Sequence, residues 1–215
     1  RSQWRGWKGA RMPKQKTFRA DGGSDWRTIK VLNTVTGKVM ADEIKWAKFT
    51  NISWVGNEGF LYSRFAEPQE GAAFQLLNYN QTVYYHKIGT PQSEDKAIYA
   101  TPDKPEYGHS AQVTHDGKWA LITTSSGTDE KYELHVMPLG KKPTWKPQPL
   151  VTGLEHDWGL IEGMGNTLWF TTNKDAAKLK VVTVDLGAKT PVFTDVIAER
   201  AETLSRAQIV GDRLI

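Results

Sequence analysis

The 215-residue sequence contains no cysteine, which excludes disulfide bonds, cysteine nucleophiles and cysteine metal ligands. It also has no run of about eighteen apolar residues, the length that a membrane-spanning helix needs. The first residues are basic and are not followed by the apolar core of a signal peptide. We therefore expect no membrane partner. The absence of cysteine leaves the compartment open, because cytoplasmic and periplasmic proteins can both lack it.

The common motifs of catalysis and phosphate binding are missing as well. The sequence has no Gly-x-x-x-x-Gly-Lys phosphate loop, no Gly-x-Gly-x-x-Gly dinucleotide motif and no His-Glu-x-x-His zinc motif. The nearest approach to a nucleophile elbow is Gly22-Gly23-Ser24-Asp25-Trp26, where tryptophan stands in place of the required glycine. We predict no catalytic residue, no metal site and no cofactor in this chain.

Histidines and paired carboxylates were considered as acid, base or ligand groups. Packing or a local hydrogen bond is the favoured role for all five histidines, which are His86, His109, His115, His135 and His156. Adjacent carboxylates at Glu94-Asp95 and Asp129-Glu130 would point to opposite faces of an extended chain. Neither pair is therefore expected to share a reaction.

The net charge of +4 results from an excess of basic residues near the N-terminus. Residues 1–20 hold seven Lys and Arg and no acid, so the remainder of the chain is slightly acidic. Basic residues interleaved with Trp4 and Trp7 could contact phosphates and stack on bases. The segment lacks the alternation of a strand, however, so we expect residues 1–20 to lie outside the fold and predict no nucleic-acid partner.

Strand-like runs ending in a glycine turn recur about every fifty residues. These runs are rich in β-branched and aromatic residues, a pattern typical of strands; they span 28–36, 82–88, 132–139 and 179–186 and end near Gly37, Gly89, Gly140 and Gly187. A second set of glycine turns, around Gly56, Gly117, Gly165 and Gly211, falls between them. Repeats of this length with several antiparallel strands are typical of β-propeller blades, and a β-sandwich is the alternative. Trp119 and Trp169, which follow such turns, are expected to fill space between packed sheets.

Several segments resemble, in order and spacing, the propeller domain of the prolyl oligopeptidase family. They are Gly22–Lys30, Lys48–Thr50, Asn78–Gln81, Tyr84–Asp95 and Gly127–Asp129, and the stretch Gly89–Asp95 is the most specific. The resemblance runs from Asp21 to Ile215. It implies an all-β fold, a partial β-propeller with four-stranded antiparallel blades over residues 21–215, roughly half of the family's seven blades, without the catalytic α/β-hydrolase domain.

The resemblance implies the function of a serine peptidase of family S9 that cleaves short peptides after proline. In that family the Ser-Asp-His triad lies on the hydrolase domain, which the propeller covers, so no triad residue is expected here. The implied partners are short proline-containing peptides and the protein's own hydrolase domain, and the implied compartment is the cytoplasm or the periplasm. We expect this chain alone to be inactive and marginally stable, since an unclosed propeller exposes sheet surfaces.

Four positions are implied to face substrate near the third subsite: Leu32, Trp46, Lys48 and Asn51. Strand packing or a solvated edge is the alternative role for each. Alternation would place Trp46 and Lys48 on one face and Asn51 on the other, unless a bulge intervenes. The alternative function for the whole chain is a non-catalytic propeller that binds peptide or protein ligands.

Overall fold

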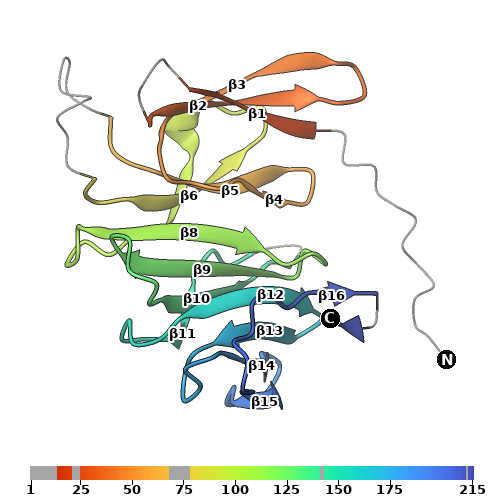
Figure 1. Cartoon of the computed structure of the whole chain (residues 1–215). Coiled ribbons are helices and arrows are strands. Elements are labelled where there is room, and N and C mark those ends of the chain that lie inside the picture. Colours follow the sequence, from red (N-terminus) through yellow and green to blue (C-terminus); the bar gives the residue numbers. More distant parts are fainter. Residues whose placement is uncertain (1–13, 21–24, 68–77, 141–142, 212) are drawn as a thin grey trace.

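The computed structural model describes residues 14–20, 25–67, 78–140, 143–211 and 213–215, and within these ranges the regular structure is β-strand except for one 3-10 turn, η1 (Gln92–Glu94). Neighbouring strands are antiparallel and follow one another in chain order. Figure 1 shows the resulting sheets stacked face to face as successive layers. The prediction of an all-β partial propeller is confirmed.

The first layers belong to one seven-stranded sheet that contains two blades. The first blade holds β1 (Lys14–Ala20), β2 (Arg27–Asn33) and β3 (Lys38–Ala47), and the second holds β4 (Ser53–Val55), β5 (Gly59–Arg64), β6 (Thr82–Lys87) and β7 (Lys96–Tyr99). Among the described residues β3 and β5 pair at one position, Ala47 with Arg64. The two blades are therefore distinct layers joined at one corner.

The third and fourth blades are separate four-stranded sheets. The third holds β8 (Tyr107–Val113), β9 (Trp119–Ser126), β10 (Glu133–Pro138) and β11 (Gln148–Val151). The fourth holds β12 (Trp158–Met164), β13 (Thr167–Thr172), β14 (Lys180–Asp185) and β15 (Phe193–Ile197). A last hairpin, β16 (Ile209–Val210) with β17 (Arg213–Leu214), has the position of the first two strands of a further blade.

The hydrophobic core lies between the blades. Because side chains alternate across a strand, a central strand contributes to two interfaces at once. In β9, Ala120 and Ile122 pack toward the second blade, whereas Leu121 packs toward the fourth. In β5, Phe60 packs toward the first blade and Leu61 toward the third. Each blade is thus stabilised chiefly by its neighbours, as expected for a stacked repeat.

The four predicted strand runs correspond to β2, β6, β10 and β14. The glycines that end them are not equivalent, because Gly37 and Gly89 have positive φ angles whereas Gly140 and Gly187 do not. The glycines of the other set, Gly56, Gly117, Gly165 and Gly211, all have φ between 56° and 71°. The stricter repeat is therefore the hairpin between the first two strands of each blade, where the left-handed conformation favours glycine.

The predicted boundary at residue 20 is corrected by β1. This strand lies inside the segment that was expected to be outside the fold, and it pairs with β2 from Lys14–Asn33 to Ala20–Arg27. Its pairing uses backbone groups, which explains why a sequence without apolar alternation can still form a strand. Residues 1–13 and 21–24 lie outside the described residues, and with them the predictions for Trp4, Trp7 and the Gly22-Gly23-Ser24 segment.

Candidate functional site

A cavity of about 370 Å³ opens where connections of the first, second and third blades meet. Its lining comes from the β3–β4 connection, the residues just after β5 and just before β6, the strands β8 and β9, and the connection after β9. It includes Phe49, Phe65, Gln81, His109, Ser125 and Tyr132. These segments leave the same edge of successive sheets, because each blade repeats the same chain path. The propeller thus gathers residues from three blades into one concavity.

One wall of the cavity is aromatic. Phe65 is buried, while Phe49 is 60% exposed. Trp26 contacts Phe65 edge to face, with ring centroids 6.0 Å apart, and contacts Trp46 in the same way at 5.8 Å. The Lys48 ammonium lies 4.9 Å from the Phe49 ring centroid and 5.2 Å from that of Trp26. A cation at such distances is attracted by the ring faces, so these side chains form one connected cluster.

The other side of the cavity is polar and nearly uncharged. His109 is buried; its Nδ1 lies 2.9 Å from Thr124 Oγ1 and its Nε2 lies 3.1 Å from Thr101 Oγ1. Burial, together with the nearby His135, lowers the pKa of His109 to about 4. The imidazole is therefore neutral near pH 7. Among the described lining residues Glu106 is the one charged group, so the cavity offers a ligand mainly apolar and uncharged polar groups.

The structure brings two of the four predicted substrate-facing residues together. Trp46, at the end of β3, has a φ of 61°. This left-handed residue lies where the pairing of β3 with β2 shifts register, between the pairs Ile29–Ile44 and Arg27–Ala47. Both Trp46 and Lys48 contact Trp26. Lys48 also lies 3.8 Å from the Asp25 carboxylate. Their role in facing substrate stays a prediction.

The other two residues lie elsewhere. Asn51 is an exposed residue of the β3–β4 connection. Leu32 is half-buried and pairs with Val39, whereas the cavity end of β2 is marked by the pair Arg27–Ala47. Five residues of strand place Leu32 roughly 16 Å along β2 from that end. The structure therefore does not group Leu32 with Trp46 and Lys48.

Sequence reasoning missed Phe49, Gln81 and His109 as cavity residues. Phe49 and Gln81 both fall inside segments that carry the family resemblance, Lys48–Thr50 and Asn78–Gln81. A phenylalanine in a connection between strands was an available signal, since an exposed aromatic on a loop is typical of a binding surface. The approach of these segments to β8 required the stacking of the blades.

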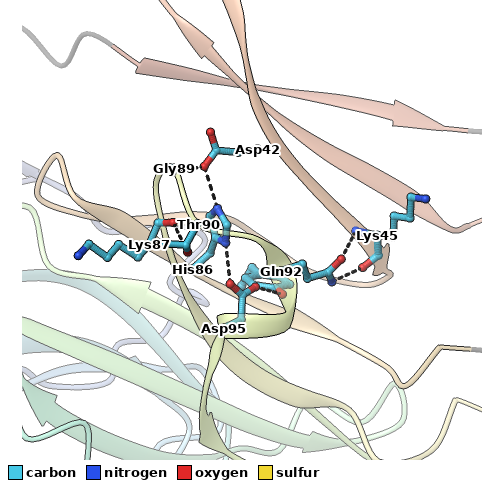
Figure 2. Close-up of polar contacts among 9 residues, drawn as sticks. Asp42, Lys45, His86, Lys87, Gly89, Thr90, Gln92 and Asp95 are labelled. Carbon is cyan, nitrogen blue, oxygen red and sulfur yellow. Dashed lines mark hydrogen bonds and ion pairs between the residues drawn. The ribbon is translucent and has the colours of Figure 1, made fainter.

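A second polar cluster, formed by Asp42, Tyr62, His86 and Asp95, is buried between the first and second blades. His86 Nε2 lies 3.0 Å from Asp42 Oδ1, and His86 Nδ1 lies 2.6 Å from Asp95 Oδ1. Tyr62 donates its hydroxyl proton to Asp95 Oδ2 at 2.6 Å. Figure 2 shows the imidazole between the two carboxylates. The side chains of His86, Asp42 and Asp95 are at most 1% exposed, so substrate has no access to them.

This buried cluster explains the structural role of Gly89–Asp95, the segment with the most specific family resemblance. The Gly89 amide donates to Asp42 Oδ1, and the Gln92 side chain exchanges two hydrogen bonds with the backbone of Lys45, at 2.9 and 3.0 Å. Burial lowers the pKa of His86, but hydrogen bonds and charge attraction from Asp95 and Asp42 raise it further, so the net direction is upward. The segment therefore docks the second blade on β3, and the hydrogen bond from His86 to Asp42 is a contact between blades rather than the local hydrogen bond that was one predicted role.

Other ligand classes were searched for in the described part of the chain. No group of three or more His, Asp or Glu side chains there is placed to hold a metal ion. No helix among those residues has the length and apolar character needed to cross a membrane.

Comparison with known proteins gives consistent matches. Residues 19–215 match the family described as prolyl oligopeptidase, N-terminal beta-propeller domain. The prolyl endopeptidase of Elizabethkingia miricola is 33% identical over 186 residues, which cover 86% of this chain and 26% of that protein. The dual function macrocyclase-peptidase POPB of Galerina marginata is 32% identical over 198 residues, covering 84% of this chain and 27% of that protein.

Solved structures agree with the sequence matches. A structure from a study of two prolyl endopeptidases and their inter-domain dynamics is 43% identical, with a TM-score of 0.88 over 94% of this chain and 28% of that one. Prolyl oligopeptidase B from Galerina marginata, bound to a 25mer macrocyclization substrate, is 27% identical with a TM-score of 0.78, over 91% and 29% of the two chains. The chain spans about a quarter of the length of the curated relatives it matches.

Proposed function

Because this chain belongs to the prolyl oligopeptidase family, as part of its N-terminal β-propeller domain, we propose that it is the substrate-gating portion of a serine endopeptidase that cleaves short peptides after proline. The observation that carries the proposal is the match of residues 19–215 to the family's propeller. The Ser-Asp-His triad would come from an α/β-hydrolase domain, the proposed partner of this propeller. The catalytic sequence would then be serine attack assisted by histidine, followed by hydrolysis of the acyl-enzyme.

The cavity supports a role in holding part of the peptide. Its aromatic wall, Phe49 and Phe65, suits an apolar side chain, while hydroxyl groups such as those of Ser125 and Tyr132 suit peptide amides. The near absence of charge also suits a neutral backbone. We propose that a short proline-containing peptide contacts this cavity.

The four positions implied by the resemblance fit this proposal unequally. Trp46 and Lys48 flank the cavity through Trp26, and Asn51 lies in the connection that carries Phe49. We therefore propose these three as peptide contacts. Leu32 has the weakest support, because it lies toward the opposite end of β2.

The proposal is tested by producing the chain alone and together with the sequence that flanks it in its gene. Both proteins are incubated with a fluorogenic Gly-Pro peptide, with the matched Gly-Ala peptide, and with a folded proline-containing protein. We expect the longer protein to cleave only the Gly-Pro peptide and to react with a serine-directed fluorophosphonate. The chain alone should bind the peptide without cleaving it.

Two other results would be decisive. Peptide binding by the longer protein, without cleavage and without fluorophosphonate labelling, would replace the peptidase with the non-catalytic binding scaffold. Absence of peptide binding by both proteins would overturn the proposed function. The cytoplasmic or periplasmic location stays a prediction, which fractionation of the source cells would test.

A further inference from the structure

The connection that carries Phe49 into the cavity wall has an unusual backbone. Trp46 has a φ of 61° and Phe49 a φ of 50°. Both values lie in the left-handed region, which bulky residues seldom occupy. Such conformations persist where surrounding contacts hold them, and they gather at ligand-binding positions. Two of them within four residues call for a specific restraint.

At Phe49, Gln81 supplies that restraint. Its Nε2 donates to the carbonyl oxygens of Lys48, at 3.0 Å, and of Phe49, at 3.3 Å. Its Oε1 accepts the backbone N–H of His109 at 2.6 Å. Gln81 is 3% exposed, so water has little access to these bonds. One amide therefore joins the β3–β4 connection to β8, directly beneath the cavity.

The chemistry of an amide is required at this position. Two carbonyl oxygens need a donor on one side, and a backbone N–H needs an acceptor on the other, which the carboxamide supplies in one orientation. A carboxylate would place an oxygen against the two carbonyls. An apolar side chain would leave all three backbone groups unsatisfied, which is unfavourable in a buried site.

The Phe49 ring has little else to define its position on the cavity side. It is 60% exposed, and its ring contacts the Lys48 ammonium. The direction of the ring is consequently set by the backbone at residues 48 and 49. That backbone is held by Gln81.

We propose that Gln81 is a positioning residue that sets Phe49 in the wall of the cavity and thereby determines which apolar side chain of a peptide is accepted. The selectivity part rests on the proposed peptide-binding function. The positioning part depends only on the contacts of Gln81 and on the backbone of the β3–β4 connection.

The positioning part is tested by chymotrypsin cleavage after Phe49 in the intact chain, mapped by mass spectrometry. The variant Gln81→Glu is compared with Gln112→Glu, the same chemical change at an exposed position of β8. We expect Gln81→Glu to accelerate cleavage after Phe49 by about tenfold, because two buried hydrogen bonds are lost. Gln112→Glu should leave the rate unchanged. A rate for Gln81→Glu within about twofold of the parent chain would overturn the proposal.

The selectivity part is tested by fluorescence anisotropy with two labelled peptides that carry phenylalanine or alanine upstream of the proline. Gln81→Glu should reduce the preference for the phenylalanine peptide by about tenfold, as should Phe49→Ala, and the double variant should be no worse than Phe49→Ala alone. Additive losses would indicate that Gln81 acts only on general stability, and would overturn the selectivity part. If the parent chain binds neither peptide, the proposed function fails, while the chymotrypsin result still decides the positioning role.

A folding defect would not leave the question open. Should Gln81→Glu fail to fold, Gln81→Met replaces it with a side chain of similar length that lacks the donor. In the parent chain, NMR should show the Gln81 side-chain amide protons exchanging with water at least about a hundredfold more slowly than those of exposed Gln112. Equal exchange of the two amides would overturn the proposal.

Discussion

His86 Nε2, on β6, lies 3.0 Å from Asp42 Oδ1, on β3. This contact joins two blades whose strands β3 and β5 pair at one position among the described residues. The apolar part of this interface is built from residues such as Ile44 and Phe60. A buried polar contact of this kind fixes how two apolar surfaces align, because a misplaced partner would remain unpaired.

Removal of the Asp42 carboxylate is expected to destabilise the fold strongly. Asp42→Ala should lower the free energy of unfolding by about 3–5 kcal/mol, because it leaves a buried imidazole and the Gly89 amide without their partner. Urea unfolding measures the change. Asp103→Ala, at an exposed position, is the control and should change stability by less than about 0.5 kcal/mol. Equal effects of the two changes would contradict a structural role for the contact.

The stability of the protein should fall as the pH rises above neutrality. The raised pKa of His86 means that the folded protein keeps a proton that the unfolded chain loses near pH 6.5. The stabilisation is therefore complete below pH 6.5 and is lost as the pH rises through the folded-state pKa. The facing titratable groups are Asp42, Asp95 and Tyr62. Urea unfolding between pH 6 and 9 measures the slope, which should disappear in His86→Gln.

The opposite dependence is expected on the acid side, from His109. Its pKa is lowered to about 4 by burial and by His135, so below pH 6.5 the unfolded chain gains a proton that the folded protein excludes. Stability should therefore fall between pH 6.5 and about 4, by at most about 3 kcal/mol from this residue. His109→Gln should flatten this part of the curve. An unchanged slope in that variant would assign the acid sensitivity to other groups.

Two glycines should respond differently to the same substitution. A Cβ at Gly59 would overlap the carbonyl oxygen of His86 and approach the Tyr85 ring, whereas a Cβ at Gly140 would meet nothing within 4 Å. Neither glycine has a positive φ. Gly59→Ala should therefore lower the free energy of unfolding by about 3 kcal/mol through overpacking, while Gly140→Ala should be within about 0.5 kcal/mol of the parent chain. Thermal and urea unfolding measure both.

Substitutions at two phenylalanines should separate an effect on stability from an effect on peptide binding. Phe60 is fully buried between the first two blades, and Phe49 is 60% exposed in the cavity wall. Phe60→Ala should lower the free energy of unfolding by about 3–5 kcal/mol, whereas Phe49→Ala should change it by less than about 1 kcal/mol. Only Phe49→Ala is expected to weaken peptide binding in a protein that remains folded. Circular dichroism followed by anisotropy measures the two effects in turn.

The strand β1 shows where local sequence patterns were insufficient. Residues 14–20 lack the apolar alternation that predicted β2, β6, β10 and β14. They nevertheless pair with β2 along its whole length. Backbone hydrogen bonds can be made by almost any residue, so a strand held by them leaves no side-chain signature.

The cavity shows the same limit for function. Lys48–Thr50 and Asn78–Gln81 were recognised as family segments, yet Gln81 joins Lys48, 33 positions before it, to His109, 28 positions after it. Neither the positive φ of Phe49 nor the hydrogen bonds of Gln81 is visible in a strand pattern. Sequence position likewise did not show that Leu32 lies away from Trp46 and Lys48. That separation becomes known only once the register of the paired strands is known.

The sequence by itself determined the repeat, the strand runs and the family. Alternation and glycine turns are local properties of the chain, and the family is recognised from the order and spacing of its motifs. The tertiary structure alone decided what the missing cysteines and missing catalytic motifs had left open, namely how this chain is held together and where its cavity lies. The buried Asp42–His86 contact and the Gln81 amide depend on the stacking of blades, since each joins segments that meet only after apolar faces pack. That packing supplies both the stability and the cavity.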